Sequence, residues 1–172
     1  MAAGANSDWI GAILRWLEGT EAAVYVAQSD WAFPIIETIH VIAIALVIGT
    51  ISVVDLRILE WASAARPYRQ IAAEVLPWTW ATFCLAVLTG GLLFISQASE
   101  YFGNTAFRIK LILLMLAGIN MMTFEFVIAR DPAWDRDDRA SLLGKIAAAI
   151  SLTLWISVVF FGRRIGFTMA PG

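Results

Sequence analysis

The chain has 172 residues, of which 60% are hydrophobic and 15% are Asp, Glu, Lys or Arg, whereas soluble domains are about half apolar and about a quarter charged. This balance excludes an ordinary soluble fold and indicates a surface that faces lipid. The formal net charge of -2 provides no basic field, which excludes nucleic acid as the partner.

The N-terminal segment predicts two short helices that are too polar to cross a bilayer. Ser7 is a candidate N-cap for the first helix, whose apolar face carries Trp9, and Gly19 is a candidate end. Thr20 is the expected cap of the second helix, which continues to about Ser29. An amphipathic helix of this kind lies along the membrane surface, so we expect residues 1–30 to be interfacial.

Four apolar runs follow, and each is long enough to cross the bilayer as a helix. We place these spans at about 32–54, 79–96, 107–129 and 142–161. The first run would be about 34 Å long as a helix, against a hydrocarbon core of about 30 Å. We expect Pro77 to open the second span, and the polar segment DPAWDRDDR to separate the third from the fourth.

The sequence therefore predicts an all-α integral membrane protein. Residues 31–172 form a four-transmembrane-helix bundle, and an N-terminal interfacial amphipathic helix precedes it, because only helices with internally satisfied backbones fit these segments. The loops after the first and third spans hold more Lys and Arg than the opposite side. This bias predicts a multi-pass protein of a bacterial inner membrane with both termini on the non-cytoplasmic side.

Small residues at helical spacing line one face of two spans. They are Thr82, Ala86 and Gly90 in the second span and Gly144, Ala148 and Ser151 in the fourth. Small side chains let helix backbones approach closely in a membrane. They indicate either packing within the chain or the seam of a homo-oligomer.

Ionisable residues inside the spans are the main candidates for a functional site, because charge is costly in a membrane. The spacing predicts an outer layer of Glu37, His40 and Lys110 and, about 22 Å away, an inner layer of Asp55, Arg57 and Glu125. We interpret the inner layer as structural, since its members can pair or reach water near the cytoplasmic interface.

His40 and Lys110 each have more than one interpretation. A neutral His40 imidazole can hydrogen-bond and serve packing, can ligate haem iron or copper, or can relay protons. Lys110 can extend to the headgroups, or can pair with Glu37 or with a propionate of a bound cofactor. The spacing alone does not choose between these roles.

Two segments carry a resemblance to a known family. The segments IETIHVIAIALVIGTISVVDLRIL and FRIKLILLMLAGIN resemble the histidine helix and lysine helix of the HemJ-type protoporphyrinogen oxidases, and the membrane domain of the CopD copper-resistance proteins is also similar. The resemblance implies haem b ligation by His40 and a functional role for Lys110. Further histidines of that family are missing here, so we carry over a cofactor site and not the oxidase activity.

The leading hypothesis is a haem b binding membrane protein that acts in electron transfer or porphyrin-related redox chemistry, with His40 as axial ligand and with Lys110 and Glu37 at the site. One alternative is a copper-handling protein that uses His40 and Glu37. A second alternative is a non-catalytic membrane subunit or assembly factor. The lipid bilayer is the expected partner in every case.

Overall fold

The computed structural model describes residues 2–62, 66–124, 126 and 140–169. The chain divides into two compact units, Met1–Ala45 with Thr82–Thr105, and Leu46–Ala81 with Ala106–Gly172. We call them unit 1 and unit 2. The division falls within two long helices, so each of these helices contributes residues to both units.

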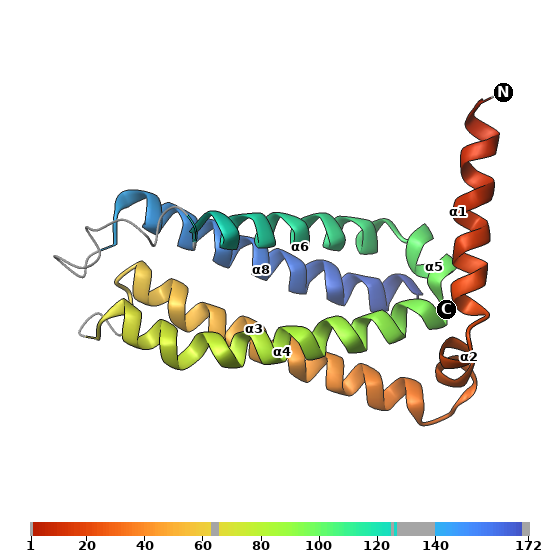
Figure 1. The fold of residues 1–172 in the computed structure, drawn as a ribbon, viewed down its shortest axis with the longest axis horizontal. Helices are drawn as coiled ribbons and strands as arrows, with labels where there is room; N and C mark the ends of the chain where they lie inside the picture. Colours follow the sequence, from red (N-terminus) through yellow and green to blue (C-terminus); the bar gives the residue numbers. More distant parts are fainter. Residues whose placement is uncertain (1, 63–65, 125, 127–139, 170–172) are drawn as a thin grey trace. The chain divides into compact units, whose positions relative to one another are not determined.

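Four long helices form most of the described chain (Figure 1): α3 (Ala32–Ile58), α4 (Tyr68–Ser96), α6 (Thr105–Thr123) and α8 (Leu142–Met169). Over the described residues, these four are long and apolar enough to cross a membrane, and no strand occurs. The prediction of an all-α, four-span fold is confirmed, and the chain is a multi-pass membrane protein.

Helix α4 begins earlier than the sequence predicts. It starts at Tyr68, so Pro77 lies inside the helix instead of at its start. A proline within a helix costs about 3 kcal/mol because it removes a backbone donor and crowds the preceding turn. Burial of Tyr68, Ile71 and Ala72 ahead of the proline offsets this cost.

The other spans also differ from their predicted bounds. Helix α3 begins at Ala32, as predicted, and continues to Ile58. Helix α8 continues past Arg163 and Arg164, which the sequence analysis placed at its end. The rest of the predicted third span after Phe126, and the segment DPAWDRDDR, lie outside the described residues.

The N-terminal helices belong to unit 1. Helix α1 (Ala2–Glu18) starts before Ser7, which therefore does not cap it, because the alanine-rich first residues are themselves strong helix formers. Helix α2 (Glu21–Gln28) has the predicted cap, since the Thr20 side chain accepts a hydrogen bond from the Ala23 amide.

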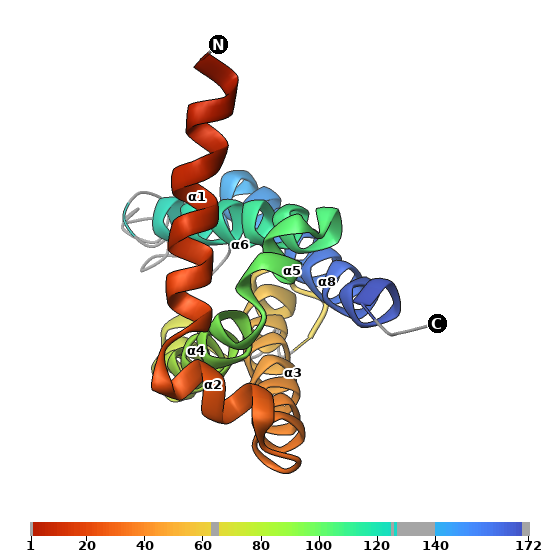
Figure 2. The ribbon, with the colours of Figure 1, turned by 90° about the vertical axis from the view of Figure 1, so that its right-hand side faces the viewer.

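A short helix that the sequence analysis did not predict, α5 (Ala98–Gly103), lies against α1 (Figures 1 and 2). The Ser99 amide at its start donates a hydrogen bond of 2.7 Å to the Glu18 carboxylate. A carboxylate in this position satisfies a backbone donor that the first turn of a helix leaves unpaired. This contact therefore joins the end of α1 to the start of α5.

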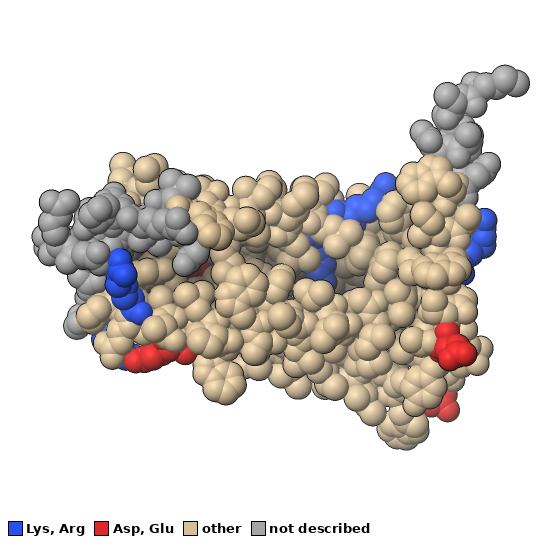
Figure 3. All heavy atoms as spheres, in the orientation of Figure 1, with Lys and Arg blue, Asp and Glu red and all other residues tan. Residues whose placement is uncertain are grey.

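Large apolar side chains remain exposed along the spans, including Val41, Leu88, Leu111 and Ile156. On the face drawn in Figure 3, uncharged residues cover most of the spans, and the acidic side chains lie near helix ends. Exposed apolar side chains over a whole helix are the expected surface of a protein that is solvated by lipid.

The core of unit 2 lies where α3, α4 and α8 meet. Ile58, Tyr68, Ala72 and Ala148 form a buried cluster, and the Tyr68 ring meets Phe124 edge to face at 5.8 Å between centroids. Ala148 belongs to the small-residue face of α8, so this part of the face packs within the chain. The prediction of close packing by small residues is met here without a second copy.

Candidate functional site

His40 is held between two helices of unit 1. It projects from α3 toward α4, where its Nδ1 atom lies 3.0 Å from the hydroxyl oxygen of Thr89. The ring is half-buried. His40 therefore does not point outward into lipid.

The Thr89 hydroxyl can select which ring nitrogen carries the proton. Its oxygen also lies 2.7 Å from the carbonyl of Leu85 in its own helix. When the hydroxyl donates to that carbonyl, it accepts from His40, and in this tautomer Nδ1 carries the hydrogen and Nε2 carries the lone pair of the neutral ring. Histidines that ligate metals commonly have the same arrangement, in which one ring N–H donates to a protein oxygen and the other nitrogen binds the metal.

Gly90 makes room for the His40 ring. A Cβ atom at position 90 would lie 2.8 Å from His40 Cε1 and 3.5 Å from Nε2, while nothing lies within 4 Å of a Cβ at Gly91. The first distance is too short for a real contact, so any side chain at position 90 would displace the imidazole or the helix. The ring is thus oriented by a hydrogen bond on one side and close to bare backbone on the other.

Glu37 lies one turn before His40 on α3 and is exposed. Its carboxylate acts on Tyr101 of α5: burial raises the pKa of the Tyr101 phenol above its usual value, and the negative charges of Glu37 and Glu100 raise it further. Glu37 is therefore close to α5 within unit 1.

Lys110 lies on α6 in unit 2. Its Nζ atom would be 3.8 Å from a Cβ at Gly162 of α8, so the ammonium group reaches the neighbouring helix. Among the described residues of unit 2, no carboxylate forms an ion pair with it. Lys110 belongs to unit 2, whereas Glu37 and His40 belong to unit 1, so the convergence of the three residues stays a prediction.

Two members of the predicted inner layer have partners other than each other, and the structural interpretation of that layer stays a prediction. Asp55 and Arg57 are 6% and 2% exposed, so neither reaches water, and they do not pair with each other. Residues two apart on a helix point to different faces. Instead, Asp55 receives a hydrogen bond from the Ser151 hydroxyl of α8, and Arg57 Nε donates to the carbonyl of Arg66. Glu125 lies outside the described residues.

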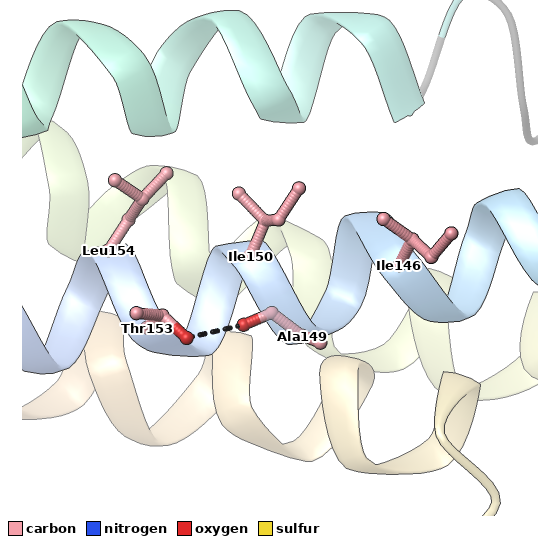
Figure 4. Close-up of a pocket in the computed structure, with 5 residues that line it drawn as sticks. All are labelled: Ile146, Ala149, Ile150, Thr153 and Leu154. Carbon is pink, nitrogen blue, oxygen red and sulfur yellow. Dashed lines mark hydrogen bonds between the residues drawn. The ribbon is translucent and has the colours of Figure 1, made fainter.

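One hollow on the surface of α8, of about 340 Å³, lies away from these polar groups. Figure 4 shows Ile146, Ile150 and Leu154 on one side of the helix, and the Thr153 hydroxyl directed at the Ala149 carbonyl, to which it donates at 2.8 Å. Because the Thr153 hydroxyl already donates within its own helix, the lining of the hollow is mainly apolar.

Sequence reasoning found the histidine but missed what orients it. Thr89 was not singled out, and Gly90 was assigned only to a packing face. Ser151 was likewise a packing residue, and Asn120, which donates from α6 to the Ala147 carbonyl of α8 at 3.1 Å, received no role. Thr89 and Gly90 are a hydroxyl residue and a glycine next to each other in a predicted span. That combination is the signal that could have identified them as neighbours of the histidine.

In the described regions no group of three or more His, Cys, Asp or Glu residues gathers, and a cofactor role for His40 stays a prediction. Comparison with known proteins matches residues 12–168 to a family described as a family of unknown function, DUF6644. No curated protein and no solved structure matches the chain. The match covers most of the sequence, including His40, Thr89, Gly90 and Lys110, and the chain therefore belongs to the DUF6644 family.

Proposed function

We propose that this protein binds haem b in the membrane and acts in electron transfer or porphyrin-related redox chemistry, with His40 as axial ligand. The observation that carries the proposal is the orientation of the imidazole. The Thr89 oxygen lies 3.0 Å from Nδ1, where it can accept from the ring, and in that tautomer Nε2 carries the lone pair that a metal ligand needs.

The residues present fit the requirements of haem in number and kind. Because the porphyrin supplies four nitrogen ligands, one imidazole from the protein is enough to hold the iron on one side. Copper needs its ligands from side chains, and no group of three or more His, Cys, Asp or Glu residues gathers in the described part of the chain. Haem is therefore the better match to a single oriented histidine.

Each residue around the imidazole has a distinct task. In the proposed site Thr89 would fix the ring tautomer and make the ligating nitrogen more basic, and Gly90 leaves the space in which the ring lies. Lys110 is the proposed charge partner of a propionate, since no carboxylate in the described part of unit 2 pairs with it. When bound, haem supplies iron that accepts and releases one electron, with a potential set by its ligand and surroundings.

The excess of Lys and Arg in the loops after the first and third spans supports a further part of the proposal. The protein would lie in a bacterial inner membrane with both termini on the non-cytoplasmic side. Assembly into a homo-oligomer, which could supply a sixth ligand from a second copy, is also a proposal. Native mass spectrometry of the detergent-solubilised protein tests it directly.

The test is the absorption spectrum and metal content of protein purified from cells supplied with haem. We expect a Soret band and haem b in the pyridine haemochrome assay, with strong loss of both in His40→Ala. Gly91→Ala is the matched control, because a Cβ there meets nothing within 4 Å. Copper without haem would replace the proposal by the copper-handling alternative, and protein with neither would favour a non-catalytic subunit.

A further inference from the structure

Asp55 has an unusual environment for a carboxylate. It lies near the end of α3 in unit 2 and is 6% exposed. The Ser151 hydroxyl of α8 donates a hydrogen bond to the carboxyl group, yet the Oδ2 atom is buried with no hydrogen-bond partner. Among the described residues, Oδ2 is the one buried side-chain atom in this state.

Three basic groups in the described part of unit 2 near this end of the helices have other partners. Arg57 donates to the Arg66 carbonyl, Arg66 pairs with Glu74 at 2.8 Å, and Lys145 of α8 pairs with Glu60 at 2.9 Å. Of the elements around Asp55, α4 adds the titratable Tyr68 and Arg69, and the described part of α6 after Lys110 adds no charged residue.

A negative carboxylate in this position would be poorly compensated. Burial removes the water that stabilises the charge, and a single hydroxyl replaces only part of it. Adding one proton removes the charge at once. The position near the end of α3 also places the group a short distance from water at the membrane surface, from which the proton can come and to which it can return.

We propose that Asp55, together with Ser151, is a proton-binding site of the membrane domain. The carboxylate takes one proton from water to become a carboxylic acid and releases it again as the carboxylate, with no change of oxidation state. A proton needs only one oxygen atom, whereas a bound metal cation requires several oxygen ligands. The proposal is independent of haem binding at His40.

Asn120 supports the geometry of this site. Its amide donates from α6 to the Ala147 carbonyl of α8, one helical turn before Ser151. This hydrogen bond fixes α6 on α8 next to the serine. The part of α8 that carries the Ser151 hydroxyl is therefore held in place by a hydrogen bond to α6.

Infrared spectroscopy of the full-length protein in lipid tests the proposal, because a protonated carboxyl has a C=O stretching band that a carboxylate lacks. We expect the wild type at neutral pH to show one such band, which shifts in deuterated water, is lost as the pH rises, and is absent in Asp55→Asn. Glu74→Gln is the matched control, since its exposed, ion-paired carboxylate should contribute no band.

Ser151→Ala provides a second measurement that does not depend on the folding of the Asp55 variant. Removing the donated hydrogen bond should shift the band to higher frequency without abolishing it. Absence of a protonated-carboxyl band in the wild type, or a band that is unchanged in both Asp55→Asn and Ser151→Ala, would overturn the proposal.

Discussion

Two of the ionisable side chains on helix α3, His40 and Asp55, have surroundings that differ in kind. In unit 1, the His40 ring lies within hydrogen-bond distance of the Thr89 hydroxyl and packs against the backbone at Gly90, which has no side chain. In unit 2, Asp55 receives one hydroxyl and keeps a buried oxygen without a partner. An oriented neutral ring is suited to ligating a metal, whereas an incompletely satisfied acid is suited to exchanging a proton.

This comparison distinguishes two ways in which a membrane helix makes a polar group functional. Orientation depends on neighbours that fit the group, so changes to those neighbours should alter ligation. A buried carboxylate that lacks hydrogen-bond donors destabilises the fold when it is charged. Replacing Asp55 by the neutral isostere asparagine should therefore not lower the stability of the protein.

The largest effect is expected from Gly90→Ala. The new Cβ would lie 2.8 Å from His40 Cε1, so the ring must leave its position, at a cost of about 1–3 kcal/mol for overpacking. We expect loss of haem and a lower thermal unfolding temperature in detergent. Gly91→Ala, one residue later, should change neither quantity. Equal behaviour of the two variants would show that the ring does not depend on Gly90.

Removal of the orienting hydroxyl should have a smaller effect. Thr89→Val keeps the shape of the side chain but leaves His40 Nδ1–H without its acceptor, which costs about 1–3 kcal/mol if the group stays buried. We expect weaker haem retention and a shifted reduction potential, measured by redox titration. Thr89→Ser should restore both. A potential that is the same in Thr89→Val and in the wild type would contradict the assigned role.

Lys110 should matter for the cofactor more than for the fold. Because no carboxylate in the described part of unit 2 pairs with its ammonium, Lys110→Ala should leave the unfolding temperature of the haem-free protein unchanged or higher. Haem affinity should fall, and Lys110→Arg should retain part of it. If Lys110→Ala lowers the stability of haem-free protein strongly, the lysine is a structural partner instead.

The smallest effect concerns Tyr101, outside the spans. Burial, Glu37 and Glu100 raise the pKa of its phenol in the folded protein above the usual value of 10.0. The contribution of the neutral phenol to folding stability is therefore present below pH 10.0 and is lost as the pH rises through the pKa of the folded protein. Glu37→Gln should lower the pKa of Tyr101 modestly, seen as tyrosinate absorbance at lower pH. Tyr101→Phe identifies the signal. An unchanged titration in Glu37→Gln would place Glu37 away from the phenol.

The sequence was sufficient to predict the class of fold and the four spans, because runs of apolar residues leave no other way to satisfy the backbone in lipid. It failed at the start of α4, where burial of Tyr68 and Ile71 outweighs the proline signal of Pro77. It also failed at the start of α1, where alanine propensity extends the helix ahead of Ser7.

For the candidate site, spacing along one helix identified His40 but not its neighbours on another helix. The contact between His40 and Thr89 joins residues 49 apart in sequence, and helical periodicity carries no information on which faces of two helices meet. The same reason explains why the partners within the inner layer were not predicted. Asp55 and Arg57 are close in sequence, yet Ser151 of α8 is the partner of Asp55.

The most direct test of axial ligation is the absorption spectrum of His40→Gly with and without added imidazole. Glycine leaves a space that free imidazole can enter, so the ligand is returned without the side chain. We predict that the variant loses the Soret band of the wild type and that imidazole restores it, while Gly91→Ala keeps it throughout. A His40→Gly variant that binds haem with the wild-type spectrum in the absence of imidazole would contradict the role of His40.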